Sequence, residues 1–96
     1  MRQLKIDAFV IRSLMRDLVS HDKKPSAFLV FLYIYYAIEK EADDSVALSL
    51  NQLVGATGLS RSAVQSGLQT LLKRELLSAE KKTVTATPVY RIHKHW

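Results

Sequence analysis

The sequence predicts a mainly α protein with a small β-hairpin, an α+β fold contained in one domain. Four segments before residue 75 space their apolar residues as helices do, and two short segments after it alternate as strands do. The chain has 96 residues, of which 48% are apolar, and this suits a single hydrophobic core. We therefore expect residues 1–96 to form one domain.

The N-terminal segment, residues 1–21, is expected to be a packing and dimerisation helix. Between Ile6 and Ser20 the helical wheel divides into an apolar half and a polar half, so the segment is amphipathic with a broad apolar face. The apolar half holds Val10, Ile11, Leu14, Met15, Leu18 and Val19. The polar half holds Arg12, Ser13, Arg16, Asp17 and Ser20.

Residues 25–41 are expected to form the core helix. Pro25 suits the first turn, where its missing N–H has no partner to lose. The segment "AFLVFLYIYYAI" is apolar on every side, so this helix should be covered all round by the rest of the domain, the first helix or a second subunit. One small domain offers too little surface to cover both helices, which predicts a homodimer formed through the N-terminal helices.

Two short helices are expected between residues 49 and 74. After the short strand "VALSL", Ser49 is a good N-cap for a helix over Leu50 to Ala56, and Gly58 is free to take the positive φ of a tight turn. Ser60 caps the next helix, which runs to about Arg74. The buried side of this second helix is expected to carry Val64, Leu68, Leu71 and Leu72.

A β-hairpin is expected over residues 76–93. The segments "LLSAE" and "PVYRIH" both have strand composition, and the polar stretch "KKTVTAT" joins them.

The segment "SLNQLVGATGLSRSAVQSGLQTLLKRELL", followed by this hairpin as the wing, resembles the winged helix-turn-helix family of bacterial DNA-binding domains. It is similar to the modules of MarR-type and GntR-type transcription regulators and of phage and plasmid replication proteins. The resemblance covers about half of the chain at the level of motifs. It implies a winged helix-turn-helix preceded by an extra N-terminal helix.

The spacing of apolar residues predicts which face of the second short helix is exposed. Leu53, Leu59, Val64 and Leu68 can lock the two short helices across one small apolar cluster, with Gly58 at the corner. The side chains left outside can hydrogen-bond base edges in a major groove, as glutamine does with adenine and arginine with guanine. These candidate base-reading residues are Arg61, Ser62, Gln65, Ser66 and Gln69.

A second set of polar and basic residues surrounds that face and is expected to hold phosphates or to probe the minor groove. It comprises Ser60 at the helix start, Lys73 and Arg74 at its end, and Lys81, Lys82, Thr83, Thr85 and Arg91 on the wing.

Two features depart from the family pattern, and Gly67 is costly within a helix. Val54 and Gly55 stand where a small residue, often alanine, is usual in the first short helix, which would alter a packing distance. Glu75 replaces a usual glycine before the wing, and a left-handed residue there would cost roughly 1–2 kcal/mol, which favours an exit turn of different construction. Gly67 costs about 1 kcal/mol against alanine within a helix, and suggests close approach to DNA or to a neighbouring helix.

Charge is unevenly distributed along the chain. Residues 1–48 hold seven basic and seven acidic side chains, whereas residues 49–96 hold seven basic side chains against Glu75 and Glu80 alone. The second half therefore carries the whole net charge of +5. Such a half suggests a polyanionic partner, and charge alone does not distinguish DNA, RNA and an acidic protein surface.

Several functional classes find no support in the sequence. Without cysteine there is no disulfide, thiol nucleophile or cysteine-bound zinc. No phosphate-cradling glycine loop or activated nucleophile is visible, and the pair His93 and His95 is a weak metal signal, so we expect neither enzymatic activity nor a metal or other cofactor. The longest apolar run is too short to cross a bilayer and the N-terminus lacks an apolar signal core, which favours a cytoplasmic protein that does not engage membranes.

The motif and the uneven charge together lead us to expect sequence-specific binding of double-stranded DNA by a small bacterial, phage or plasmid transcription regulator. Two alternatives stay open. One is a winged-helix module that binds another protein, and the other is the DNA-binding module of a replication or partition protein.

Overall fold

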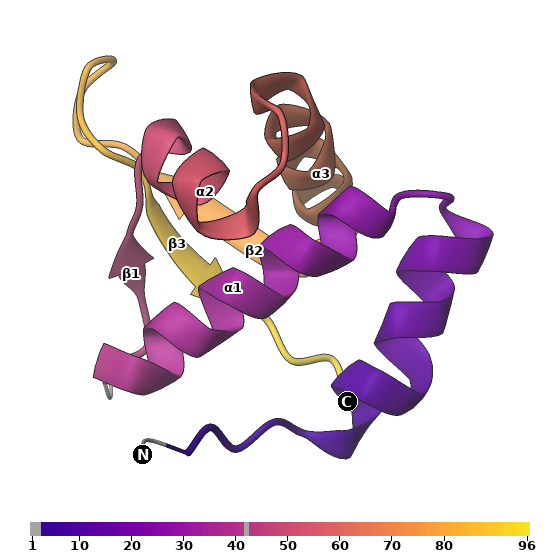
Figure 1. Cartoon of the computed structure of the whole chain (residues 1–96). Coiled ribbons are helices and arrows are strands. Elements are labelled where there is room, and N and C mark those ends of the chain that lie inside the picture. The colour runs from indigo at the N-terminus through magenta and orange to yellow at the C-terminus, as the bar shows by residue number, and fades with distance from the viewer. Residues whose placement is uncertain (1–2, 42) are drawn as a thin grey trace.

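Helices and strands follow one another in the expected order, and the fold is mainly α with a small antiparallel sheet (Figure 1). The computed structural model describes residues 3–41 and 43–96. Its elements are η1 (Val10–Leu14), η2 (Asp17–His21), α1 (Pro25–Glu41), β1 (Val46–Ala47), α2 (Leu50–Thr57), α3 (Arg61–Lys73), β2 (Leu77–Glu80) and β3 (Val89–Ile92). No helix in the described ranges combines the length and apolar character needed to cross a bilayer.

The N-terminal helix, residues 8–21, contains the two π-helical segments η1 and η2. The N–H of Met15 bonds to the carbonyl of Val10, which is the i→i+5 spacing of a π-helix. The helix buries one row of its apolar residues, Val10, Leu14 and Leu18, each at most 2% exposed. The second row that the wheel predicted, which we call the Ile11 row, comprises Ile11, Met15 and Val19 at 38–44% exposed. The broad apolar face is therefore only half used within the chain.

Helix α1 is the central element of the fold. In Figure 1 it crosses the molecule with the N-terminal helix on one side and α2, α3 and the sheet on the other. Phe31, Ile34 and Tyr35 are almost fully buried, as a core helix requires. Within one chain α1 is not covered all round, because Leu29 is 44% and Tyr36 is 36% exposed. Cover by a second subunit stays a prediction.

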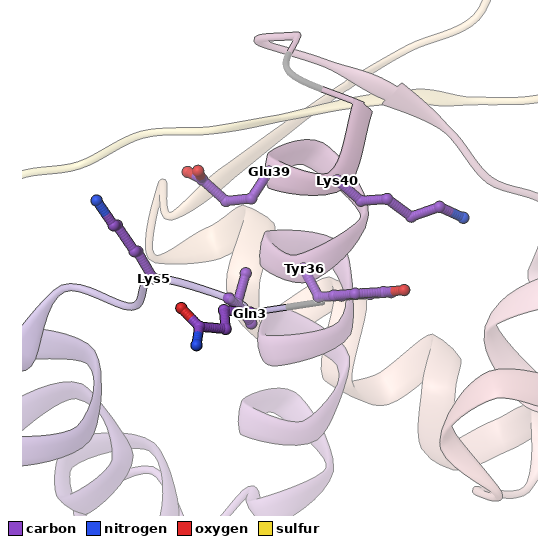
Figure 2. A pocket seen from close by; sticks show the side chains of 6 residues that line it. Gln3, Lys5, Tyr36, Glu39 and Lys40 are labelled. Atoms are coloured by element: carbon purple, nitrogen blue, oxygen red, sulfur yellow. The ribbon is translucent and has the colours of Figure 1, made fainter. Parts of the chain in front are cut away.

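Tyr36 borders an open pocket of about 450 Å³ between α1 and the N-terminal arm, residues 3–7. Figure 2 shows Gln3 and Lys5 of the arm on one side of this pocket, with Tyr36, Glu39 and Lys40 of α1 on the other. Leu4 also lines the pocket, so polar, charged and apolar side chains together surround one aromatic ring.

The helix pair α2 and α3 begins and ends through local caps. The Ser49 hydroxyl accepts from Gln52 N at 3.1 Å and the Gln52 side chain accepts from Ser49 N at 2.8 Å, which completes a capping box at the start of α2. Gly58 ends α2 with φ at 75°, in the left-handed region. Ser60 then caps α3 by accepting from Ala63 N. The expected tight turn at Gly58 between α2 and α3 is confirmed.

The hairpin of β2 and β3 belongs to a three-stranded sheet. Leu77 pairs with Ile92 and Glu80 with Val89, so the hairpin has the expected position, and its connection is residues 81–88, the β2–β3 loop. Strand β1 adds to the other edge of β3, with Val46 opposite Tyr90. The sequence predicts β1 but not its place in the sheet, because a two-residue strand has no pattern that identifies its partner.

The turn after α3 contains a residue with left-handed backbone conformation. The expectation that Glu75 would avoid this conformation is wrong. Glu75 has φ at 57°. Its N–H bonds to Leu72 O, and Leu76 N–H bonds to Leu71 O, which together form a Schellman motif. Leu76 is 6% exposed, and its burial holds the strained turn in place.

Gly67 meets a neighbouring helix. A Cβ at this position would lie 3.1 Å from the Cα and N of Ala27, in the first turn of α1. In the first short helix, by contrast, a Cβ on Gly55 would meet nothing within 4 Å, and the preceding Val54 packs against the core.

The C-terminal tail, residues 93–96, connects the sheet to the N-terminal helix. Asp7 Oδ2 accepts a hydrogen bond from Trp96 Nε1 at 3.2 Å and pairs with Lys94 Nζ at 3.2 Å. The Trp96 ring stacks on Phe9 with a centroid separation of 4.8 Å. The pKa of Asp7 is lowered, first by the Trp96 hydrogen bond and then by Lys94.

Candidate nucleic-acid interface

Four of the five candidate base-reading residues lie on the exposed side of α3. Arg61, Ser62, Gln65 and Gln69 are all exposed, while Val64, Gly67 and Leu71 face the core. The face presents amides, a hydroxyl and one guanidinium, which are groups that can donate to and accept from base edges.

Ser66 lies at a different edge of α3. It is half-buried, and its hydroxyl accepts a hydrogen bond from Lys24 Nζ at 2.8 Å. Ser66 therefore positions a cation beside α3 instead of standing in the centre of the exposed face.

Lys24 is a basic residue beside α3 that the sequence did not indicate. It lies in the turn before α1, within the half of the chain whose charges cancel, so composition gave it no significance. The fold brings it next to α3, and the hydrogen bond to Ser66 uses only one of the three donors of its ammonium group. Its neighbour Lys23, which has φ at 54°, is exposed in the same turn.

Arg61 is held by the preceding helix. Its Nη1 donates to Asn51 Oδ1 of α2 at 2.6 Å, across the corner formed by Gly58. The exposed guanidinium is thus fixed to α2 by its side chain as well as to α3 by its backbone.

The β2–β3 loop carries the remaining exposed cations of the hairpin. Lys81, Lys82, Thr83 and Thr85 are all exposed, and the two threonine hydroxyls lie 3.5 Å apart. Between them Val84 is 91% exposed. In Figure 1 this loop projects to one side of α3, and the turn that precedes α1 lies to the other.

Three cations of the basic half are paired with carboxylates of the first half. Arg74 contacts Asp22 at 3.2 Å, Arg91 contacts Asp44 at 2.9 Å and Lys94 contacts Asp7 at 3.2 Å. The pKa of Asp22 is lowered, mainly by the hydrogen bond to His21 and further by the charge of Arg74. Arg74 and Arg91, two of the candidate phosphate-binding residues, are therefore partly neutralised by the fold.

Ser60 uses its hydroxyl inside the chain. The oxygen accepts from Ala63 N at 3.1 Å and lies 3.3 Å from the Ser62 hydroxyl. Its first role is thus the N-cap of α3, and either hydroxyl can be the donor in the contact with Ser62.

The unpaired cations around α3 are consequently only in part those that the sequence indicated. Within residues 3–41 and 43–96, no carboxylate lies at ion-pair distance from Arg61, Lys73, Lys81 or Lys82, or from Lys23 and Lys24. These six side chains form the set that we call the α3 basic group. Arg61 and Lys73 are the two end residues of α3, Lys23 and Lys24 lie in the turn before α1, and Lys81 and Lys82 lie in the β2–β3 loop.

Comparisons of the chain with protein-family models, with curated proteins and with solved structures found no match.

Proposed function

We propose that this protein binds double-stranded DNA sequence-specifically through a winged helix-turn-helix, as a non-enzymatic cytoplasmic transcription regulator. The observation that carries the proposal is the exposed face of α3, where Arg61, Ser62, Gln65 and Gln69 stand outward between two sources of cations. Lys24 lies on one flank, and the β2–β3 loop with Lys81 and Lys82 lies on the other. A duplex that received α3 in its major groove would present its two phosphate backbones to these two flanks.

Base recognition would depend on few side chains. Gln65 and Gln69 have the amides that pair with adenine, and Arg61 has the guanidinium that pairs with guanine, each bidentate pair being worth about 1–3 kcal/mol of discrimination. The phosphate contacts of the α3 basic group supply the affinity that does not depend on sequence.

The test is fluorescence anisotropy with mixed-sequence duplex DNA over a series of salt concentrations. We expect binding that weakens steeply with salt, since each neutralised phosphate contributes about 0.9 to the slope of log K against log salt. The Lys24→Ala variant should lower this slope by about 1. The Arg91→Ala variant is the matched control, and it should lower the slope less because Asp44 already neutralises Arg91.

Absence of binding to duplex DNA at low salt would refute the proposed function. An Arg91→Ala effect as large as that of Lys24→Ala would instead leave DNA binding intact and contradict only the assignment of the α3 basic group.

We also propose a homodimer formed through the N-terminal helices. The Ile11 row is exposed along the helix although it is entirely apolar, and a second copy related by a two-fold axis would cover the same row on both chains. A dimer of this kind would present two α3 helices and would recognise a two-fold symmetric site.

The alternative of a protein-binding module has one supporting observation. Three basic side chains of the second half are engaged in ion pairs, which lowers the charge available to a polyanion. Salt-dependent retention on DNA resin, compared with co-purification of a partner protein, separates the two functions. A role in replication or partition would use the same DNA contacts as transcription regulation.

A further inference from the structure

The hydrogen bond between Asn51 and Arg61 joins the two helices of the pair at the exposed surface. Asn51 lies in the first turn of α2, and both side chains are exposed. Asn51 makes no capping contact, because Ser49 and Gln52 complete the capping box of α2 by themselves. The 2.6 Å contact with Arg61 therefore has no evident role in closing α2.

The chemistry of the two groups determines how they face each other. A guanidinium has only donors, so the Asn51 oxygen must point to Arg61, and its NH₂ group points away. The contact uses Nη1 of Arg61. This leaves the edge formed by Nε and Nη2, whose two parallel N–H groups match the O6 and N7 acceptors of guanine.

We propose that Asn51 is a positioning residue that orients Arg61 so that its Nε–Nη2 edge reads one guanine. This inference rests on the proposed function and adds to it the base that Arg61 recognises and the residue that sets its geometry. An exposed arginine otherwise samples many rotamers, and ordering them on binding opposes recognition. A fixed guanidinium plane reduces that loss and rejects bases whose acceptors do not match.

The experiment begins with selection of bound sequences from random duplex DNA by the wild-type chain. Dissociation constants are then measured for the selected site and for versions in which each guanine in turn is replaced. The Arg61→Ala variant identifies the base pair that Arg61 reads, because replacing that base pair no longer changes the dissociation constant of this variant. The same measurements follow for Asn51→Ala, Asn51→Asp and the double variant Asn51→Ala with Arg61→Ala. Gln3→Ala, which removes an exposed amide on the N-terminal arm outside the helix pair, is the control.

We expect the wild type to prefer guanine at that base pair by about 5- to 150-fold. Asn51→Ala should reduce this preference several-fold at that base pair alone, and it should change nothing further once Arg61 is alanine. Asn51→Asp keeps an acceptor for Arg61, so it should retain the preference while weakening binding to all duplexes through repulsion of phosphates. A merely structural effect of residue 51 would lower affinity and preference together in both variants. Circular dichroism and the thermal midpoint should match those of Gln3→Ala.

Two results would overturn the inference while leaving the proposed function intact. The first is an unchanged guanine preference in Asn51→Ala. The second is an equal loss from Asn51→Ala in the presence and absence of Arg61, which would make Asn51 itself the reading residue. A wild-type chain that binds no duplex at low salt would refute the proposed function and this inference with it.

Discussion

Gly67 of α3 lies directly against the backbone of Ala27 in α1. Even a methyl group would be crowded between them, since a Cβ on residue 67 would lie 3.1 Å from two backbone atoms of Ala27. Ala27 is fully buried, and backbone atoms of a helix in the core have little freedom to move. The glycine therefore sets the distance between the central helix and the helix that presents the candidate base-reading face.

The two helical glycines, Gly67 and Gly55, should respond to alanine in opposite directions. Gly67→Ala gains helix propensity of about 1 kcal/mol but overpacks the α1 contact, which typically costs about 1–3 kcal/mol, so we expect net destabilisation. Gly55→Ala gains the same propensity in open space and should stabilise the protein by about 0.5–1 kcal/mol. Urea unfolding of both variants measures the difference. Stabilisation by Gly67→Ala would show that α1 and α3 do not approach as closely as described.

Glu75 is expected to limit stability because of its left-handed backbone. Glu75→Gly should raise the free energy of unfolding by about 1 kcal/mol, since glycine adopts this conformation without a steric penalty. Glu80→Gly removes the same charge from a residue of β2 and should be destabilising, because glycine weakens a strand. Thermal unfolding of the two variants provides the comparison. If the two substitutions changed the free energy of unfolding equally, the cause would be the lost charge and not the relief of backbone strain.

The attachment of the C-terminal tail should depend on pH through Asp7. The pKa of Asp7 is lowered in the folded chain. The ionised carboxylate therefore stabilises the folded state fully at pH values above the unfolded pKa of about 3.9. This stabilisation is lost as the pH falls through the lower pKa of the folded state. Trp96 is the one tryptophan of the chain, so its emission reports the contact with Asp7 and Phe9 directly. Titration from about pH 5 to about pH 2 should show a change in emission.

Asp7→Asn should remove most of this acid transition. Asp22→Asn is the control, because the pKa of Asp22 is also lowered but its partners are His21 and Arg74, at another part of the fold. An emission that stays constant in the wild type while circular dichroism shows an intact fold would contradict the role of Asp7.

The proposed dimer predicts that a charge in the Ile11 row dissociates the protein without unfolding it. Met15 is 38% exposed in the middle of that row, so Met15→Glu should convert a dimer to a monomer in light scattering at tens of micromolar. Arg16→Glu changes the neighbouring exposed residue outside the row and should leave the dimer intact. A wild-type chain that is already monomeric at this concentration would refute the dimer.

Local chemistry made the helix pair and the hairpin predictable from the sequence. Ser49, Gly58 and Ser60 act on backbone groups within three or four residues of themselves, so their roles could be derived before any packing was known. The exposure of Gln65 and Gln69 followed in the same way, from helical periodicity. The left-handed Glu75 could not be derived, because the burial of Leu76 stabilises a turn that local preference disfavours.

The sequence by itself therefore determined the order of the elements, their caps and the polar face of α3, because these depend on neighbours along the chain. Only the tertiary structure decided which charges surround that face. Lys24 meets Ser66 from 42 residues away, and Arg74 meets Asp22 from 52 residues away. A count of charges along the chain contains no information on such pairs, since ion pairs depend on distance in space. The fold thus partly neutralises Arg74 and Arg91 and places Lys24 beside α3.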